Sequence, residues 1–146
     1  MEYSWNEQAE LTARHIIEKH HPRLAGAKIA YLFKVKPEAP KPKRIRDGKK
    51  LTWAKASLVG PEYRSLMEQG YAFIIEFDQQ VWDWLTLEQQ EALVDHELCH
   101  CGNDADGFYM RAHDLEEFRC IVQRHGFWKD DVKEFAEAAL PLFEKA

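Results

Sequence analysis

Two histidines and a glutamate at helical spacing give this sequence its clearest chemical signal. The segment His96-Glu97-Leu98-Cys99-His100 has the HExxH pattern, with the two histidines four residues apart. On an α-helix, residues four apart lie on one face, so both imidazoles can bind one metal ion. Glu97 then faces the open side of that ion, where a carboxylate can accept a proton from an activated water. The pattern predicts a zinc site with His96 and His100 as ligands and Glu97 as general base.

The residues around this motif predict the helix that must carry it. Thr86 and Gln89 have the spacing of a capping box, in which each side chain bonds the backbone of the other. The helical pattern continues to Cys101, and Gly102 is placed where a glycine commonly ends a helix. Apolar side chains share one stripe of this helix, which we expect to face the core: Leu87, Val94, Leu98 and Cys101.

A catalytic zinc needs a third protein ligand, and the downstream sequence offers several. We predict His113, because imidazole is a strong neutral donor and a loop of about a dozen residues can return it to the motif helix. We expect His113 to begin the next helix. Glu116 or Glu117 would instead complete a His₂Glu site, or hold a ligand imidazole through its other nitrogen. Tyr109, in the loop between the ligands, is our candidate oxyanion donor.

The remaining histidines and the cysteines favour structural roles. We expect surface or capping roles for the histidines that fall on other predicted helices or their ends: His15, His20, His21 and His125. Three cysteines are present, and an odd number argues against a disulfide framework. Although Cys99 and Cys101 flank a predicted ligand, the C-x-C spacing is not a usual zinc pair, so we expect them to be small buried residues.

Length and composition are those of one globular domain. We predict a single domain over 1–146, because 45% hydrophobic and 31% charged residues suit a protein with a sizeable core. A net charge of −5 argues weakly against general nucleic-acid binding. No apolar run approaches the roughly 18 residues of a membrane span, and the first residues lack signal-peptide character. We therefore expect no membrane partner and a cytoplasmic location.

Periodicity predicts an α+β fold with a small, mostly antiparallel sheet packed on the motif helix and the C-terminal helices. The expected strands cover 28–36, 51–59 and 71–77, and the first should be central because both its faces are apolar. Besides the motif helix, we expect helical segments over 5–20, 62–69, 114–125 and 130–140. Trp82 and Trp84 should pack at the entry to the motif helix.

Residues 37–50 interrupt this pattern with three prolines and a cluster of lysines and arginines. The segment predicts a loop or a long connection between strands. It is either a solvated connection or a contact for a polyanion such as nucleic acid.

The two histidine segments, Ala92–Cys101 and His113–Phe118, resemble the putative phage metallopeptidase family and, more distantly, the SprT-like zincins. The stretch Phe73–Trp84 also resembles this family. The resemblance implies a compact zincin-like fold with an edge strand beside the metal cleft, one bound zinc and peptidase activity. SprT-like members act on proteins bound to DNA. A phage-encoded member would work in the host cytoplasm.

The sequence thus predicts a zinc metallopeptidase in which Zn²⁺ is bound by His96, His100 and His113 and Glu97 is the general base. The substrate, a protein or peptide, is expected to lie along the edge of the strand at 71–77 as an added strand. Two alternatives remain open. One is a zinc-stabilised binding module without proteolytic activity, and the other is a DNA-associated protease that uses residues 41–50.

Overall fold

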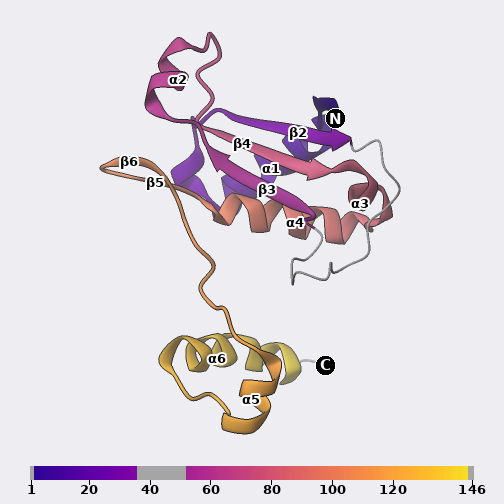
Figure 1. The fold of residues 1–146 in the computed structure, drawn as a ribbon, viewed down its shortest axis with the longest axis vertical. Coiled ribbons are helices and arrows are strands. Elements are labelled where there is room, and N and C mark those ends of the chain that lie inside the picture. Colours follow the sequence, from indigo (N-terminus) through magenta and orange to yellow (C-terminus); the bar gives the residue numbers. More distant parts are fainter. Residues whose placement is uncertain (1, 36–51, 145–146) are drawn as a thin grey trace. The chain divides into compact units, whose positions relative to one another are not determined.

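The computed structural model describes residues 2–35 and 52–144 (Figure 1). Internal contacts divide the chain into two compact units, Met1–Arg111 and Ala112–Ala146. The basic segment at 37–50 lies outside the described residues, so the prediction made for it stays a prediction. The expectations of a single domain and of C-terminal helices packed on the sheet also stay predictions.

The first unit contains a four-stranded sheet with the order β1-β2-β4-β3. Its strands are β1 (Glu2–Trp5), β2 (Ile29–Val35), β3 (Ala54–Leu58) and β4 (Phe73–Asp78). The outer pairs are antiparallel and the central pair, β2 with β4, is parallel. The mostly antiparallel sheet and the central place of β2 confirm the prediction. A separate hairpin pairs β5 (Cys101–Asp104) with β6 (Gly107–Met110).

Helices in both units complete the α+β fold that the sequence predicts. The first unit contains α1 (Glu7–His20), the short 3₁₀ helix η1 (Pro22–Leu24), α2 (Pro61–Leu66), α3 (Gln79–Trp84) and α4 (Leu87–Cys99). The second unit contains α5 (Arg119–His125) and α6 (Asp130–Glu144). None of the helices in the described part of the chain is long and apolar enough to cross a membrane.

The core of the first unit lies between one face of the sheet and the helices α1 and α4. Alternate residues of β4 supply its centre, because successive side chains of a strand point to opposite faces. The side chains of Phe73, Ile75 and Phe77 are fully buried there. Val94 and Leu98 of α4 pack against the same cluster, as the apolar stripe of the sequence predicts. The motif helix is therefore fixed to the sheet by Val94 and Leu98, on the face away from His96 and His100.

The motif helix begins where the sequence predicts and ends earlier. Thr86 is the N-cap, and both hydrogen bonds of its capping box with Gln89 are present. The predicted end at Cys101 is wrong, because α4 stops at Cys99 and strand β5 follows. Gly102 does not cap the helix: it pairs with Tyr109 across the hairpin, and a Cβ at Gly102 would lie only 2.4 Å from that ring. Its missing side chain makes room for an aromatic ring. Leu87 is exposed rather than part of the core stripe.

Three further predictions in the first unit need correction. The N-terminal helix begins at Glu7, and Trp5 before it ends strand β1 with 61% of its surface exposed. Trp82 is buried as expected, but Trp84 is exposed. The strand at 71–77 was predicted to offer a free edge, and that is wrong, because β4 lies between β2 and β3. A fourth strand, β1, occupies one edge of the sheet, so the edge beside the motif helix belongs to β3.

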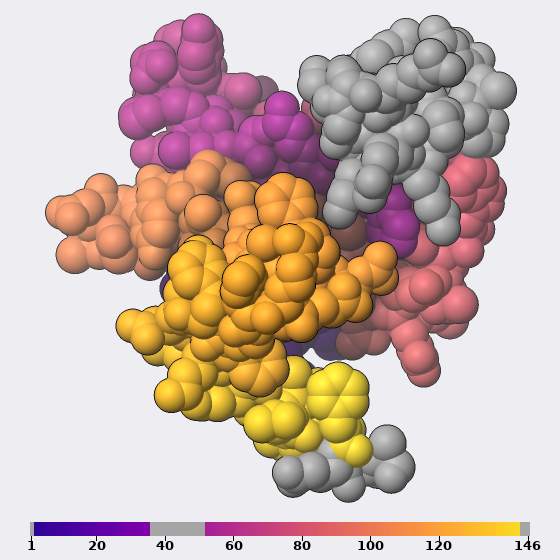
Figure 2. Space-filling view, turned by 60° about the horizontal axis from the view of Figure 1, so that its bottom comes forward, coloured from indigo at the N-terminus to yellow at the C-terminus, as the bar shows by residue number. Residues whose placement is uncertain are grey.

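The second unit, drawn from orange to yellow in Figure 2, also differs from the prediction. Helix α5 starts at Arg119, not at 114, and Phe118 just before it is exposed instead of buried. The Glu117 carboxylate bonds the backbone N–H of Phe118 and the indole of Trp128, which holds this stretch in a non-helical form. The last helix continues through Pro141 to Glu144, because a proline near a helix end removes only one backbone bond.

Candidate metal centre

His96 and His100 lie one turn apart near the C-terminal end of α4, so helix geometry alone brings their rings together. Their ring centroids are 5.2 Å apart, at an interplanar angle of 74°. One ligand nitrogen of each ring lies within 4.8 Å of the other. Two nitrogens bound to one tetrahedral zinc are about 3.3 Å apart, so small side-chain rotations bring both onto one ion.

The ring of His100 is held in the tautomer that a zinc ligand needs. Its Nδ1 lies 2.7 Å from the carbonyl oxygen of Arg111, at the end of the β5–β6 hairpin. A carbonyl can only accept, so Nδ1 carries the hydrogen and Nε2 keeps its lone pair. The backbone N–H of Arg111 in turn donates to the His100 carbonyl at 2.8 Å. A ligand histidine whose second nitrogen donates to a carbonyl is typical of zinc sites, and the donor chemistry of α4 therefore fits the metal.

Glu97 points from the same turn of α4 into a largely dry environment. Only 5% of its surface is exposed. Burial raises the pKa of the Glu97 carboxyl above its ordinary value, while His100 and the backbone N–H of Ala56 lower it in part. A carboxyl with a raised pKa, beside two imidazoles, is suited to exchange a proton.

The contact with Ala56 identifies the edge of β3 that faces α4. The Val59 N–H donates to the carbonyl of Ala72, just before β4, and the N–H of Asp78, at the end of β4, donates to the Trp53 carbonyl. In an antiparallel pair the bonded positions recur every second residue, so the odd-numbered residues of β3 face β4. Ala54, Ala56 and Leu58 must then point their backbone groups to the outer edge, which agrees with the bond from Ala56 to Glu97.

The sequence did not predict a second group of potential ligands, which consists of His21, Asp95 and Cys99. His21 caps α1, as one of its two expected roles requires, but it is buried and not on the surface, and its Nε2 lies 2.7 Å from Asp95 Oδ1. With Cys99 these residues place ligand atoms within 4.8 Å of one another. However, Arg23 contacts His21 Nδ1 at 2.9 Å, and a guanidinium can only donate. Nε2 therefore carries the hydrogen and donates to Asp95, so it has no lone pair for a metal.

Burial keeps Cys101 out of the ligand set. Its side chain is fully buried, and burial raises the pKa of the thiol to about 12. The thiol Sγ lies 3.6 Å from the carbonyl oxygen of Glu97 and can donate a weak hydrogen bond to it. Cys99 is half-buried and Cys120 is exposed, and all three cysteines are free thiols.

The remaining predicted residues lie at or beyond the end of the first unit. His113 stands two residues after Arg111, in a non-helical stretch, so the expectation that it begins a helix is wrong. Glu117 uses both carboxylate oxygens within the second unit, at 2.9 Å to Phe118 N and 3.1 Å to Trp128 Nε1. Tyr109, the suggested oxyanion donor, lies on β6 with its ring over Gly102.

Comparison with known proteins places the whole arrangement in a family. The sequence model of a family described as putative phage metallopeptidase matches residues 1–139. The match includes the sheet, the motif helix, the hairpin and most of the second unit. No curated protein and no solved structure matches the chain.

Proposed function

The chain belongs to the putative phage metallopeptidase family, and from that premise we propose that it is a zinc-dependent peptidase. The observation that carries the proposal is the last turn of α4, where two imidazoles and a buried carboxylate lie side by side. The bond from His100 Nδ1 to a backbone carbonyl, which fixes the tautomer with its lone pair on Nε2, supports zinc as the metal.

His113 is the third ligand in this proposal, for two reasons. The backbone of Arg111 contacts His100 through two hydrogen bonds, and His113 follows only two residues later. Two residues span at most about 7 Å, so the chain connection keeps His113 near the α4 ligands. Glu117, the main alternative, already accepts two hydrogen bonds within its own unit.

Bound zinc would supply a water of lowered pKa and an electrophile for the scissile carbonyl. Glu97 would accept the proton of the attacking water and then donate it to the leaving amine. The low-dielectric surroundings of Glu97 suit this role, because burial raises the pKa of its carboxyl and so favours the protonated form that must donate to the leaving amine.

The substrate would lie along the outer edge of β3, as an added strand. The backbone groups of Ala54, Ala56 and Leu58 point to this edge, and Ala56 already bonds Glu97. A peptide paired there by backbone hydrogen bonds would pass the Glu97 carboxylate. This edge replaces the one predicted at 71–77.

A proline pair tests the role of this edge. Ala54→Pro removes an N–H that points outward and leaves the bonds to β4 in place, which edge strands tolerate. We expect a raised KM for peptides with little change in the melting temperature. Lys55→Pro removes an N–H that faces β4 and should instead lower the melting temperature. Unchanged KM in a folded Ala54→Pro protein would argue against substrate binding at β3.

Metal analysis tests the ligands themselves. The purified protein should hold about one zinc per chain, and His96→Ala and His100→Ala should each lose it. His15→Ala, which removes an exposed histidine from α1, is the matched control and should keep the metal. A wild-type protein without stoichiometric metal after preparation in excess zinc would contradict the proposal.

Two other functions lead to different results in these experiments. A zinc-stabilised binding module would hold the metal but cleave no peptide. A DNA-associated protease would bind DNA with an affinity that falls as salt is raised, through the basic run at 41–50. That run lies outside the described residues, so only its composition supports this alternative.

A further inference from the structure

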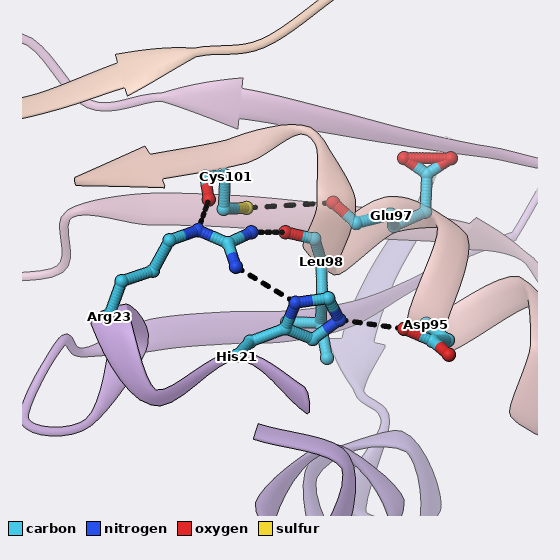
Figure 3. Close-up of polar contacts among 6 residues, drawn as sticks. All are labelled: His21, Arg23, Asp95, Glu97, Leu98 and Cys101. Atoms are coloured by element: carbon cyan, nitrogen blue, oxygen red, sulfur yellow. Dashed lines mark hydrogen bonds and ion pairs between the residues drawn. The ribbon is translucent and has the colours of Figure 1, made fainter. Parts of the chain in front are cut away.

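The last turn of α4 ends on carbonyl groups that need partners from elsewhere in the fold. The final carbonyls of a helix have no N–H of their own helix to accept from. Arg23, on η1, supplies one such partner, because its Nη2 donates to the Leu98 carbonyl of α4; its Nε donates to the carbonyl of Cys101, the first residue of β5, and both distances are 3.1 Å (Figure 3). The guanidinium thus joins the end of α4 to the start of β5.

Arg23 is itself held from two sides. Its Nη1 donates to His21 Nδ1 at 2.9 Å, and the side-chain amide of Asn103 donates to its backbone carbonyl at 3.0 Å. His21 Nε2 in turn donates to Asp95 Oδ1 at 2.7 Å. The η1 region therefore binds the chain on both sides of the ligands. It holds Asp95, just before His96, and also Leu98 and Cys101, on either side of His100.

We propose that Arg23, oriented by His21, is a positioning residue that fixes the last turn of α4 for metal binding. The proposal rests on the proposed zinc function of His96 and His100. Ligand atoms must be held within about 0.5 Å for tight metal binding, whereas helix ends tend to fray. Arg23 prevents this fraying from the side of the helix away from Glu97, whose carboxylate points away from the network in Figure 3.

A guanidinium is suited to this position for two reasons. Its charge is favourable beside the negative end of a helix dipole. Its planar donors can reach three acceptors in different directions, which a single lysine ammonium on a flexible stem cannot do with the same geometry. The three acceptors here are His21 Nδ1 and the carbonyls of Leu98 and Cys101.

The test measures metal binding in folded protein. Arg23→Met keeps most of the side-chain length and removes every donor. Zinc affinity is measured by competition with a chromophoric chelator, and the Co²⁺ spectrum reports ligand geometry, both well below the melting temperature. We expect zinc to bind about 10–100-fold more weakly and the Co²⁺ bands to change, as for other residues that orient ligands. Arg14→Met, which removes an exposed arginine paired with Glu10 on α1, should match the wild type.

A second pair of variants keeps the proposal testable if Arg23→Met does not fold. His21→Gln retains one acceptor for Arg23 and one donor for Asp95, so it should keep near wild-type affinity. His21→Leu retains neither and should lose affinity as Arg23→Met does. Wild-type affinity and an unchanged Co²⁺ spectrum in folded Arg23→Met or His21→Leu would overturn the positioning role alone. A wild-type protein that binds no zinc would overturn the proposed function, and the positioning role with it.

Discussion

Replacing Gly102 by alanine should destabilise the β5–β6 hairpin through one side chain, the ring of Tyr109. An alanine Cβ at this position would lie 2.4 to 2.6 Å from three ring carbons of Tyr109. Ordinary carbon contacts are about 3.5–4.0 Å, so the ring must move by more than about 1 Å. Overpacking of this kind costs about 1–3 kcal/mol. For roughly 100 residues, we expect the melting temperature of the first unit to fall by about 4 °C per kcal/mol.

The same substitution should have the opposite effect once the ring is gone. Tyr109 is 42% exposed, so Tyr109→Ala should be tolerated and leaves open space above Gly102. In that background Gly102→Ala should be neutral or stabilise by up to about 1 kcal/mol, because glycine is unfavourable within a strand. Urea and thermal unfolding of both single variants and the double variant measure this coupling. If Gly102→Ala changes the free energy of unfolding equally in both backgrounds, within about 0.5 kcal/mol, the reasoning is refuted.

Two further predictions concern the third ligand and the buried thiol. His113→Ala should weaken zinc binding as severely as His100→Ala, whereas Glu117→Ala should keep the metal; the reverse result would indicate a His₂Glu site. Burial raises the pKa of the Cys101 thiol from 9.0 to about 12, so the folded protein keeps a proton that the unfolded chain releases. The free energy of unfolding should therefore be greatest below pH 9 and fall between pH 9 and 12, less steeply in Cys101→Ala. Alkylation of native protein at pH 8 should label exposed Cys120 and spare Cys101, and equal labelling would contradict this burial.

Local signals in the sequence were sufficient to predict the motif helix. Thr86 and Gln89 form their capping box from residues three apart, and Val94 and Leu98 face the core because helical periodicity puts them on one stripe. The alternation of apolar residues likewise predicted β2 and β4. These features depend on neighbours in the chain.

The features that the sequence did not predict depend on distant residues. Strand β1 has only four residues, all of them exposed, and its alternation is limited to Tyr3 and Trp5, so its pairing with β2 is what reveals it. Which strand forms the edge beside α4 follows from the order of the sheet, which no single strand encodes. His21 and Asp95 are 74 positions apart, and neither has a motif that predicts their contact. Gly102 was expected to be a cap because it follows a helical pattern. The sequence could not show its actual partner, Tyr109, because that residue becomes its neighbour only when the hairpin forms.

Zinc content and peptide hydrolysis, measured on the same preparations of wild type and Glu97→Gln, test the central claim most directly. Glutamine keeps the size of the side chain and an oxygen that can accept from Ala56, but it cannot accept the proton of the attacking water. We predict about one zinc per chain in both proteins and a loss of hydrolysis of about 10²–10⁴-fold or more in the variant. Hydrolysis by Glu97→Gln at the wild-type rate would contradict the role of Glu97. Zinc-loaded wild type that cleaves no member of a peptide library would contradict the peptidase function itself.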